Sequence, residues 1–241
     1  MNSSDQNIAL VTGASRGIGR AAALALGTAG YHVIALARTV GALEELDDEI
    51  AAAGGSATLI PVDLAEQEAL SRLPAALADR FGRIDALVAN AGVLGELTPV
   101  SDIPAKVWHN AFAVNVHANL SLLAGLDPLL RASSHAHIVG ITSGRARKFV
   151  PFWAPYSATK AAFEALMLTY AAEQETFTIR TNLIDPGPIR TGMRAKAMPG
   201  EDPETLPTPE DLAPLVVELC RPDETRNGEI ISFKEWLQAN A

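Results

Sequence analysis

Short apolar segments alternate with longer helical patterns along most of the chain. The apolar segments are rich in Val, Ile, Leu or Ala, and they span residues 8–12, 32–37, 57–62, 84–89, 137–142 and 178–184, with a weaker seventh at 229–232. Continuous apolar strands separated by helices are typical of a parallel sheet that is covered on both faces. The pattern predicts an α/β fold, a doubly wound three-layer α/β/α sandwich around a mostly or wholly parallel seven-stranded sheet.

No linker, repeat or low-complexity segment divides the 241 residues, so we expect a single domain over residues 1–241. Residues 199–211 contain four prolines and five acidic residues, a composition typical of a surface loop. The loop ends at a helix start, with Thr208 as N-cap, Pro209 in the first helical position and Asp211 three residues after the cap.

Charge and cysteine content limit the classes of protein. The net charge is −9 and the pI is about 5.0, which argues against a sequence-independent grip on nucleic acid phosphates. The single cysteine, Cys220, forms no intrachain disulfide, and we expect it to be a small buried apolar residue. The polar start at 1–7 is unlike a signal peptide, and no run of 18 apolar residues predicts a membrane span. We expect a cytoplasmic protein that binds neither nucleic acid nor membrane.

Chemically useful residues follow several of the predicted strands. Gly13 comes after the first strand, Asp63 after the third, Asn90 after the fourth, Ser143 after the fifth, and Pro186-Gly187 after the sixth. Doubly wound sheets bind ligands at the carboxyl ends of their strands. The sequence therefore predicts a ligand site at this edge of the sheet.

The segment TGASRGIG at 12–19 places Gly13, Gly17 and Gly19 between a strand and a helix. Glycines permit the tight turn and let the backbone approach a pyrophosphate, whose charge then lies at the helix N-terminus. The segment predicts nucleotide binding.

The end of the second strand indicates which dinucleotide is preferred. NAD-binding folds often carry an acid there for the ribose hydroxyls, but this chain has Ala37 followed by Arg38. Charge-assisted hydrogen bonds from Arg38 to a 2′-phosphate favour NADP over NAD by about 10-fold to 100-fold. Arg16 is a second candidate for the same phosphate, and the alternative is that both arginines are merely solvated.

Asp63 has two interpretations. The segment DLAE at 63–66 fits a helix capping box, in which Asp63 accepts from the backbone and Glu66 reaches back. The other interpretation is a contact with adenine, and one carboxylate can serve both purposes.

The ordered set of motifs over about residues 8–191 resembles the short-chain dehydrogenase/reductase family. The set comprises TGASRGIG, Asn90-Ala91-Gly92, Asn115 within AVNV, Ser143, Tyr156-x-x-x-Lys160 and PGPIRT at 186–191. The resemblance implies a Rossmann-type fold, hydride transfer between NADP(H) and a small carbonyl or alcohol substrate, and a homodimer or homotetramer. It implies no metal.

The resemblance also implies a catalytic tetrad of Asn115, Ser143, Tyr156 and Lys160. Tyr156 is expected to protonate the alkoxide left by hydride transfer. The Lys160 ammonium, one turn later on the same helix face, is expected to lower the tyrosine pKa from about 10 and to bond the nicotinamide ribose. Ser143 is expected to donate to the substrate oxygen, and Asn115 to hold a water that links Lys160 to solvent.

Further cofactor contacts are implied residue by residue. Asn90 to Gly92 are expected on the adenosine side, and the segment after the sixth strand against the nicotinamide carboxamide. The implied cofactor residues are Gly13, Ser15, Arg16, Gly17, Ile18, Gly19, Arg38, Asp63, Leu64, Asn90, Ala91, Gly92, Tyr156, Lys160, Pro186, Gly187, Ile189 and Thr191.

The last 50 residues depart from the family pattern. Only 16 residues separate Thr191 from Thr208, which predicts a short substrate lid around 190–208, and the chain lacks a terminal glycine-rich strand, so dimer and tetramer both stay open. Cations near the site either attract an acidic substrate or are solvated loop charges, and they are Arg145, Arg147, Lys148, Arg190, Arg194 and Lys196. Trp153 either lines the substrate pocket or packs against the lid.

Two rival functions are weighed. One is a catalytically inactive NADP-binding regulatory protein on the same fold, and the other is an NAD-preferring alcohol dehydrogenase. The intact Asn, Ser, Tyr and Lys set favours an enzyme over a regulator, and Arg38 favours NADP.

Overall fold

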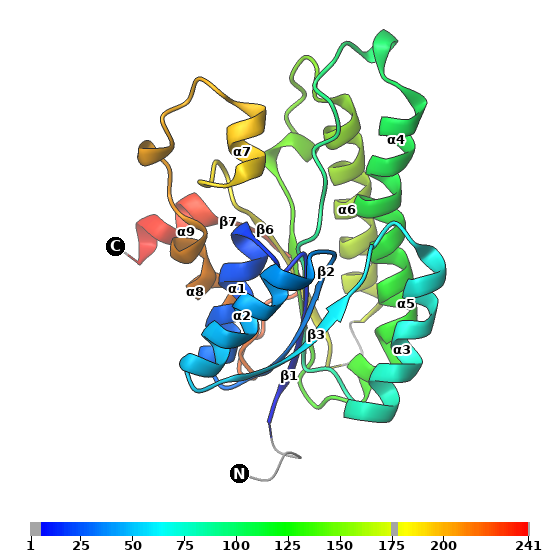
Figure 1. Ribbon diagram of the computed structural model, residues 1–241, viewed down its shortest axis with the longest axis vertical. Helices are drawn as coiled ribbons and strands as arrows, with labels where there is room; N and C mark the ends of the chain where they lie inside the picture. The colour runs from blue at the N-terminus through cyan, green and yellow to red at the C-terminus, as the bar shows by residue number, and fades with distance from the viewer. Residues whose placement is uncertain (1–5, 175–177, 241) are drawn as a thin grey trace.

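Seven parallel strands form the centre of the protein (Figure 1). The computed structural model describes residues 6–174 and 178–240. The order across the sheet is β3-β2-β1-β4-β5-β6-β7, and every neighbouring pair is parallel. The strands are β1 (Ile8–Thr12), β2 (His32–Ala37), β3 (Ser56–Pro61), β4 (Ala86–Ala89), β5 (His137–Ile141), β6 (Arg180–Asp185) and β7 (Ile230–Ser232). The predicted doubly wound, seven-stranded fold is confirmed, including the weak seventh strand.

Helices cover both faces of the sheet (Figure 1). One apolar core joins α1, α2 and α8 to the sheet, and a second joins α3, α5 and α6 to its other face. The α-helices are α1 (Gly17–Thr28), α2 (Val40–Ala52), α3 (Gln67–Phe81), α4 (Ala105–Phe112), α5 (Ala118–Arg131), α6 (Ala154–Glu173), α7 (Gly192–Ala197), α8 (Pro209–Leu219) and α9 (Phe233–Ala239). Short 3₁₀ turns lie at Val100–Asp102, Gly144–Ala146 and Pro203–Thr205, and a π-helix at Ala113–His117.

The longest helix, α6, lies close to strand β5. A Cβ added to Gly140 of β5 would lie 2.4 Å from Leu183 and 2.9 Å from the ring of Phe163, which is a fully buried residue of α6. Only glycine therefore fits at this position of the strand. The close approach places the first turns of α6 beside the carboxyl end of β5.

The predicted start of helix α8 is confirmed. Thr208 and Asp211 form the reciprocal capping box, with Pro209 in the first helical position. The proline-rich segment before it contains the short 3₁₀ turn Pro203–Thr205.

The capping box proposed for residues 63–66 is wrong. Helix α3 begins at Gln67 after Glu66, which makes no side-chain cap. Asp63 instead accepts a hydrogen bond from the backbone of Ala65 at 2.9 Å. In this Asx-type turn the Asp63 carboxylate bonds the backbone two residues later, and the helix begins only at Gln67.

Cys220 is fully buried, as predicted, and burial raises the pKa of its thiol to about 12. Within residues 6–174 and 178–240, no helix has the length and apolar character to cross a membrane.

Candidate active site

The glycine loop between β1 and α1 is held by the end of β4. The Asn90 amide donates to the Thr12 carbonyl at 2.9 Å, and the Thr12 hydroxyl accepts from the backbone of Asn90 and Ala91, each at 3.0 Å. Thr12 was not among the predicted site residues, although it begins the TGASRGIG motif. Its fully buried hydroxyl joins the two strand ends that carry the loop.

Two of the loop glycines have no space for a side chain. Gly13 has a φ of 68°, and an added Cβ would lie 2.9 Å from the Asn90 amide nitrogen. A Cβ on Gly19 would lie 2.3 Å from the same nitrogen and 2.4 Å from the Gly13 carbonyl oxygen. At these two positions the loop is therefore restricted to backbone atoms, next to the first turn of α1, which begins at Gly17. Such a loop presents free N–H groups to an anion.

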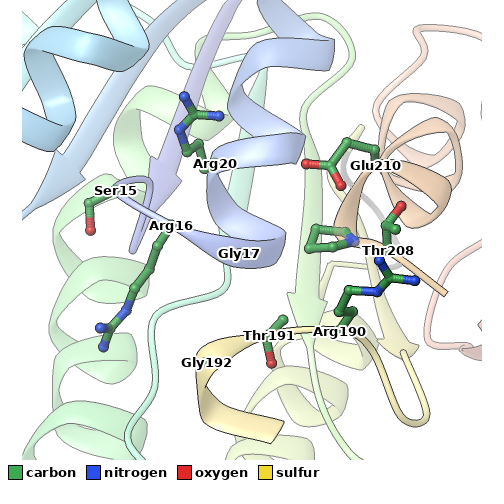
Figure 2. A pocket seen from close by; sticks show the side chains of 10 residues that line it. Ser15, Arg16, Gly17, Arg20, Arg190, Thr191, Gly192, Thr208 and Glu210 are labelled. Atoms are coloured by element: carbon green, nitrogen blue, oxygen red, sulfur yellow. The ribbon is translucent and has the colours of Figure 1, made fainter. Parts of the chain in front are cut away.

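The segment after β6 lies against this loop. A Cβ on Gly17 would lie 3.4 Å from the Thr191 side chain, and Thr191 caps α7 by accepting from the backbone of Arg194 at 3.2 Å. Gly187 has a φ of 63°, and Ile189 is buried. A cavity of about 470 Å³ lies here, and Figure 2 shows Thr191 and Gly192 opposite Gly17. Its lining residues are Ser15, Arg16, Gly17, Arg20, Arg190, Thr191, Gly192, Thr208, Pro209 and Glu210.

Tyr156 lies in the first turn of α6, almost fully buried beside the end of β5. Burial raises the pKa of its phenol to about 12, and a hydrogen bond with Ser143 partly opposes the shift. Ser143 immediately precedes the short turn Gly144–Ala146 that follows β5. The structure thus brings together the two side chains that the sequence placed 13 residues apart.

Lys160 lies one turn after Tyr156 and is also buried, with 4% of its surface exposed. Its Nζ donates to the Ile141 carbonyl at 2.6 Å and lies 5.9 Å from the centre of the Tyr156 ring. Burial lowers the pKa of Lys160 to about 8. The sequence argument expected a lowered tyrosine pKa beside this ammonium. The structure shows a raised one, because the desolvation of the phenol outweighs the contribution of its neighbours.

Asn115 lies in the π-helix Ala113–His117 between α4 and α5. Its side-chain oxygen accepts from the Val93 backbone at 2.8 Å, and its amide donates to the Val93 carbonyl and to the Thr159 hydroxyl. A Cβ on Gly92 would lie 3.3 Å from the Asn115 oxygen and 3.7 Å from Lys160 Nζ. The backbone of Gly92 therefore lies close to both Asn115 and Lys160, and a side chain at this position would crowd them.

An ionic network behind Ser143 was missed by the sequence analysis. Arg147 donates to Glu164 of α6 and, at 2.6 Å, to Asp185 of β6. Asp185 also accepts from the backbone of Gly144 at 3.0 Å, and Glu164 accepts from the Thr142 hydroxyl at 2.7 Å. These bonds fix the turn that carries Ser143. Glu164 lies four residues after Lys160, and this spacing was the only sequence signal for it.

Arg38, the residue after β2, is exposed at the edge of the site. Its guanidinium lies 3.6 Å from the Asp63 carboxylate, and 63% of its side chain is exposed. Asp63 follows β3, and the adjacent Leu64 is buried. The Asp63 carboxylate thus makes two interactions, a hydrogen bond within its own turn and an ion pair with Arg38.

The cations near the lid segment differ in their partners. Arg190 pairs with Glu204 at 3.1 Å, and Arg194 pairs with Glu201 at 2.5 Å. The guanidinium of Arg145 instead lies 4.7 Å from the centre of the Trp153 ring. Trp153 forms an apolar cluster with Leu94, Tyr156 and Ala197 of α7, so it packs beside the lid segment.

Ile18 packs partly buried against the first core, and Ser15 and Arg16 line the cavity of Figure 2. Among the described residues, no group of three or more His, Cys, Asp or Glu side chains could hold a metal ion.

Comparisons with known proteins identify the family and the fold. The family model described as short chain dehydrogenase matches residues 7–202. The chain is 36% identical over 225 residues to the oxidoreductase YciK of Escherichia coli strain K12, covering 92% of this chain and 89% of that protein. A short chain dehydrogenase of Shigella flexneri 2a strain 301, solved in complex with NADP, superposes with a TM-score of 0.90 at 34% identity, covering 95% of this chain and 97% of that one. Another from Escherichia coli CFT073, solved with NADPH, gives 0.90 at 35%, covering 95% and 96%.

Proposed function

Because the chain belongs to the short-chain dehydrogenase/reductase family, we propose that it is an NADP(H)-dependent oxidoreductase that interconverts a ketone or aldehyde and an alcohol. In this proposal Tyr156 is the general acid and base. The observation that carries the proposal is the burial of Tyr156 and Lys160 on one turn of α6, with Ser143 close enough to the phenol to lower its pKa against the effect of burial. A regulatory protein that only binds a cofactor has no use for this arrangement.

The residues at the strand ends fit a dinucleotide. The bare backbone at Gly13 and Gly19, where a Cβ would collide with other atoms, allows a pyrophosphate to approach the N-terminus of α1. The adjoining cavity of about 470 Å³ extends this cradle toward Thr191. The loop from Gly13 to Gly19, which includes Ser15, would hold the pyrophosphate. The adenosine side would lie against Asn90 to Gly92 and Leu64. The nicotinamide would contact the segment from Pro186 to Thr191.

The preference for NADP rests on the end of β2. Ala37 offers no acid to the ribose hydroxyls, while the exposed Arg38 offers a cation for a 2′-phosphate, with Arg16 as a second candidate. The related dehydrogenases of Shigella flexneri and Escherichia coli CFT073 were solved with NADP and NADPH, which supports the same choice. The Arg38 guanidinium lies 3.6 Å from Asp63, and we infer that it bonds the 2′-phosphate when NADP binds.

The chemistry divides between the cofactor and four side chains. When bound, NADPH supplies the hydride that adds to the carbonyl carbon. Tyr156 gives its proton to the oxygen that becomes the alcohol hydroxyl, and Ser143 donates a hydrogen bond to that oxygen. Because the pKa of Tyr156 is raised to about 12, the phenol carries its proton at neutral pH, which is the form that carbonyl reduction needs.

Lys160 and Asn115 act behind the tyrosine. The Lys160 ammonium stabilises the phenolate that forms when Tyr156 gives up its proton, and it bonds the nicotinamide ribose. The Asn115 side chain makes three hydrogen bonds, two with Val93 and one with Thr159, so it fixes the wall beside Lys160. We propose that a water next to this wall returns the proton through Lys160.

The rest of the chain completes the proposal. Residues 1–241 form a single domain, and the segment around 190–208 is a short lid, which helix α7 anchors through Ala197 on the Trp153 cluster. Leu120 on α5 leaves 53% of its surface exposed, which suits pairing of two copies through α5 and α6 into a homodimer or homotetramer. The substrate is a small molecule in the cytoplasm, and neither nucleic acid nor membrane is a partner.

Calorimetric titration with NADPH and then NADH, in one buffer and salt, tests the proposal first. We expect NADPH to bind about tenfold or more tightly, followed by NADPH oxidation with members of a carbonyl panel. Tighter NADH would instead support the NAD-preferring alcohol dehydrogenase. NADPH binding without turnover on any carbonyl or alcohol would support the inactive regulator. Binding of neither cofactor would contradict the proposed function and both rival functions.

A further inference from the structure

We propose that Arg145 binds a carboxylate of the substrate, so that this enzyme acts on carbonyl compounds that carry an acid group. The inference rests on the proposed function and names the substrate class of the same site. It starts from the cations around Tyr156, which the sequence alone could not separate into structural and functional ones.

Ion pairs account for most of the arginines near the site. Arg147 is neutralised by Glu164 and Asp185, Arg190 by Glu204, and Arg194 by Glu201. Arg145 differs, because the structure of residues 6–174 and 178–240 records no ion pair for it. Its guanidinium contacts only an aromatic face among the recorded interactions of its side chain. A guanidinium that is not paired with a carboxylate of the protein is available to an anionic ligand.

The position of Arg145 is fixed relative to the proposed proton donor. Its backbone N–H donates to the Ser143 hydroxyl oxygen at 3.2 Å, which fixes the main chain of Arg145 beside Ser143. Its guanidinium carbon lies 4.7 Å from the centre of the Trp153 ring, and that ring lies edge-on to Tyr156, with the two ring centres 6.0 Å apart. The cation is therefore one aromatic ring away from the phenol that would protonate the substrate.

The contact with Trp153 prepares the guanidinium for a flat two-oxygen acceptor. The guanidinium carbon lies 4.7 Å from the centre of the Trp153 ring. A guanidinium held by a cation–π contact keeps its N–H groups available to bond both oxygens of a carboxylate. Lys148 and Lys196 also have no recorded ion pair in the described chain, but both are exposed and neither has a recorded contact with the Trp153 cluster. An exposed ammonium offers no comparable geometry.

The surroundings strengthen the interaction. Leu94, Trp153 and Ala197 form an apolar wall beside Tyr156, and an ion pair next to such a wall is weakened less by water than one in open solvent. The net charge of the chain is −9, so an acidic substrate needs a local cation to overcome the general repulsion. Arg145 supplies that cation beside the Trp153 cluster that includes Tyr156.

The test compares charged and uncharged substrates of the same shape. The probes are 2-oxo, 3-oxo and 4-oxo acids of short chain length, each paired with its methyl ester, and kcat/KM is measured by NADPH oxidation. We expect the native enzyme to prefer the acid of at least one pair. In Arg145→Gln, kcat/KM for that acid should fall about 10-fold to 100-fold, while the ester changes by less than about threefold. Lys148→Gln, which removes one positive charge three residues away, is the matched control and should leave the ratio unchanged.

A second variant separates a lost contact from a damaged fold. Arg145→Lys keeps the charge but loses the planar fork, so it should retain part of the acid preference and the NADPH affinity of the native enzyme. An equal fall for acid and ester in Arg145→Gln, or native preference for the esters, overturns the inference while the proposed function stands. If no pair is turned over, calorimetric titration of the same acids into the NADPH complex decides. Binding that Arg145→Gln weakens supports the carboxylate site but not the proposed reaction, and no binding overturns the inference.

Discussion

The ammonium nitrogen of Lys160 lies 2.6 Å from the carbonyl oxygen of Ile141, the last residue of strand β5. This bond ties helix α6 to the strand end from which the Ser143 turn departs. It also keeps Lys160 buried, and burial lowers the pKa of the lysine to about 8. Burial therefore shifts the two pKa values in opposite directions: it raises the pKa of Tyr156, which keeps the phenol neutral, and lowers the pKa of Lys160.

Reductase activity should depend on the charge of Lys160. Because the lysine pKa is lowered to about 8, the ammonium is lost as the pH rises through 8, and kcat/KM for carbonyl reduction should then decline. The phenol of Tyr156 stays protonated over the same range. The measurement is a profile of kcat/KM from pH 6 to pH 10. Lys160→Arg should be less active but lack this decline, and a native profile that stays flat to pH 10 would contradict the assignment.

Removal of the Tyr156 hydroxyl should separate catalysis from cofactor binding. Tyr156→Phe is expected to lower kcat about 10²-fold to 10⁴-fold, since it removes the general acid. Its dissociation constant for NADPH should stay within about threefold of the native value. The matched control is Tyr170→Phe on the same helix, whose hydroxyl bonds Asp127 away from the site and should not affect turnover. Turnover retained in Tyr156→Phe would exclude this residue as the proton donor.

Arg38 should control the choice between the two nicotinamide cofactors. Arg38→Asp replaces the proposed phosphate ligand by a like charge, so the dissociation constant for NADPH should rise about 10-fold to 100-fold or more. NADH has no 2′-phosphate and is the internal control, with an expected change of less than about threefold. Calorimetry with both cofactors measures the two effects, and equal weakening of NADPH and NADH would refute the phosphate contact.

Gly19 and Gly41 offer a matched pair of Gly→Ala substitutions. A Cβ on Gly19 would meet the Gly13 carbonyl oxygen at 2.4 Å, so Gly19→Ala should displace the loop, abolish measurable NADPH binding and destabilise the fold by about 1–3 kcal/mol. Gly41, in α2, has no atom within 4 Å of an added Cβ, and alanine there should stabilise by about 0.5–1 kcal/mol. Urea unfolding and NADPH titration measure both variants. Normal NADPH affinity in Gly19→Ala would contradict the cradle.

The sheet and the place of the site were predictable, because they depend on features that are local in the sequence. Buried parallel strands such as β1 are continuously apolar, and Gly13, Asn90 and Ser143 each follow such a strand directly. The register of the sheet then brings these residues to one edge.

Features that depend on tertiary partners were not predictable. Asp63 looked like a helix cap, but it bonds Ala65 and lies near Arg38, which is 25 residues earlier in the chain. Arg147 looked like a solvated loop charge until the fold brought Glu164 and Asp185 to it. The raised pKa of Tyr156 likewise follows from burial, which sequence spacing does not report.

His137, at the start of β5 and so at the opposite end of the strand from Ser143, should make stability depend on pH. Its ring is buried, neither nitrogen has a hydrogen-bond partner among the described residues, and burial lowers its pKa to about 4. The unfolded chain, with a histidine pKa of about 6.5, binds more protons between pH 4 and 6.5, so the free energy of unfolding should fall as the pH falls through this window. The contribution of His137 is roughly 2 kcal/mol between pH 7 and pH 5. Urea unfolding at these two pH values should show that loss, and His137→Leu should reduce it by about this amount. The same change at exposed His109 controls for the substitution itself, and a His137→Leu variant with the native pH dependence would show that this ring is not the titrating group.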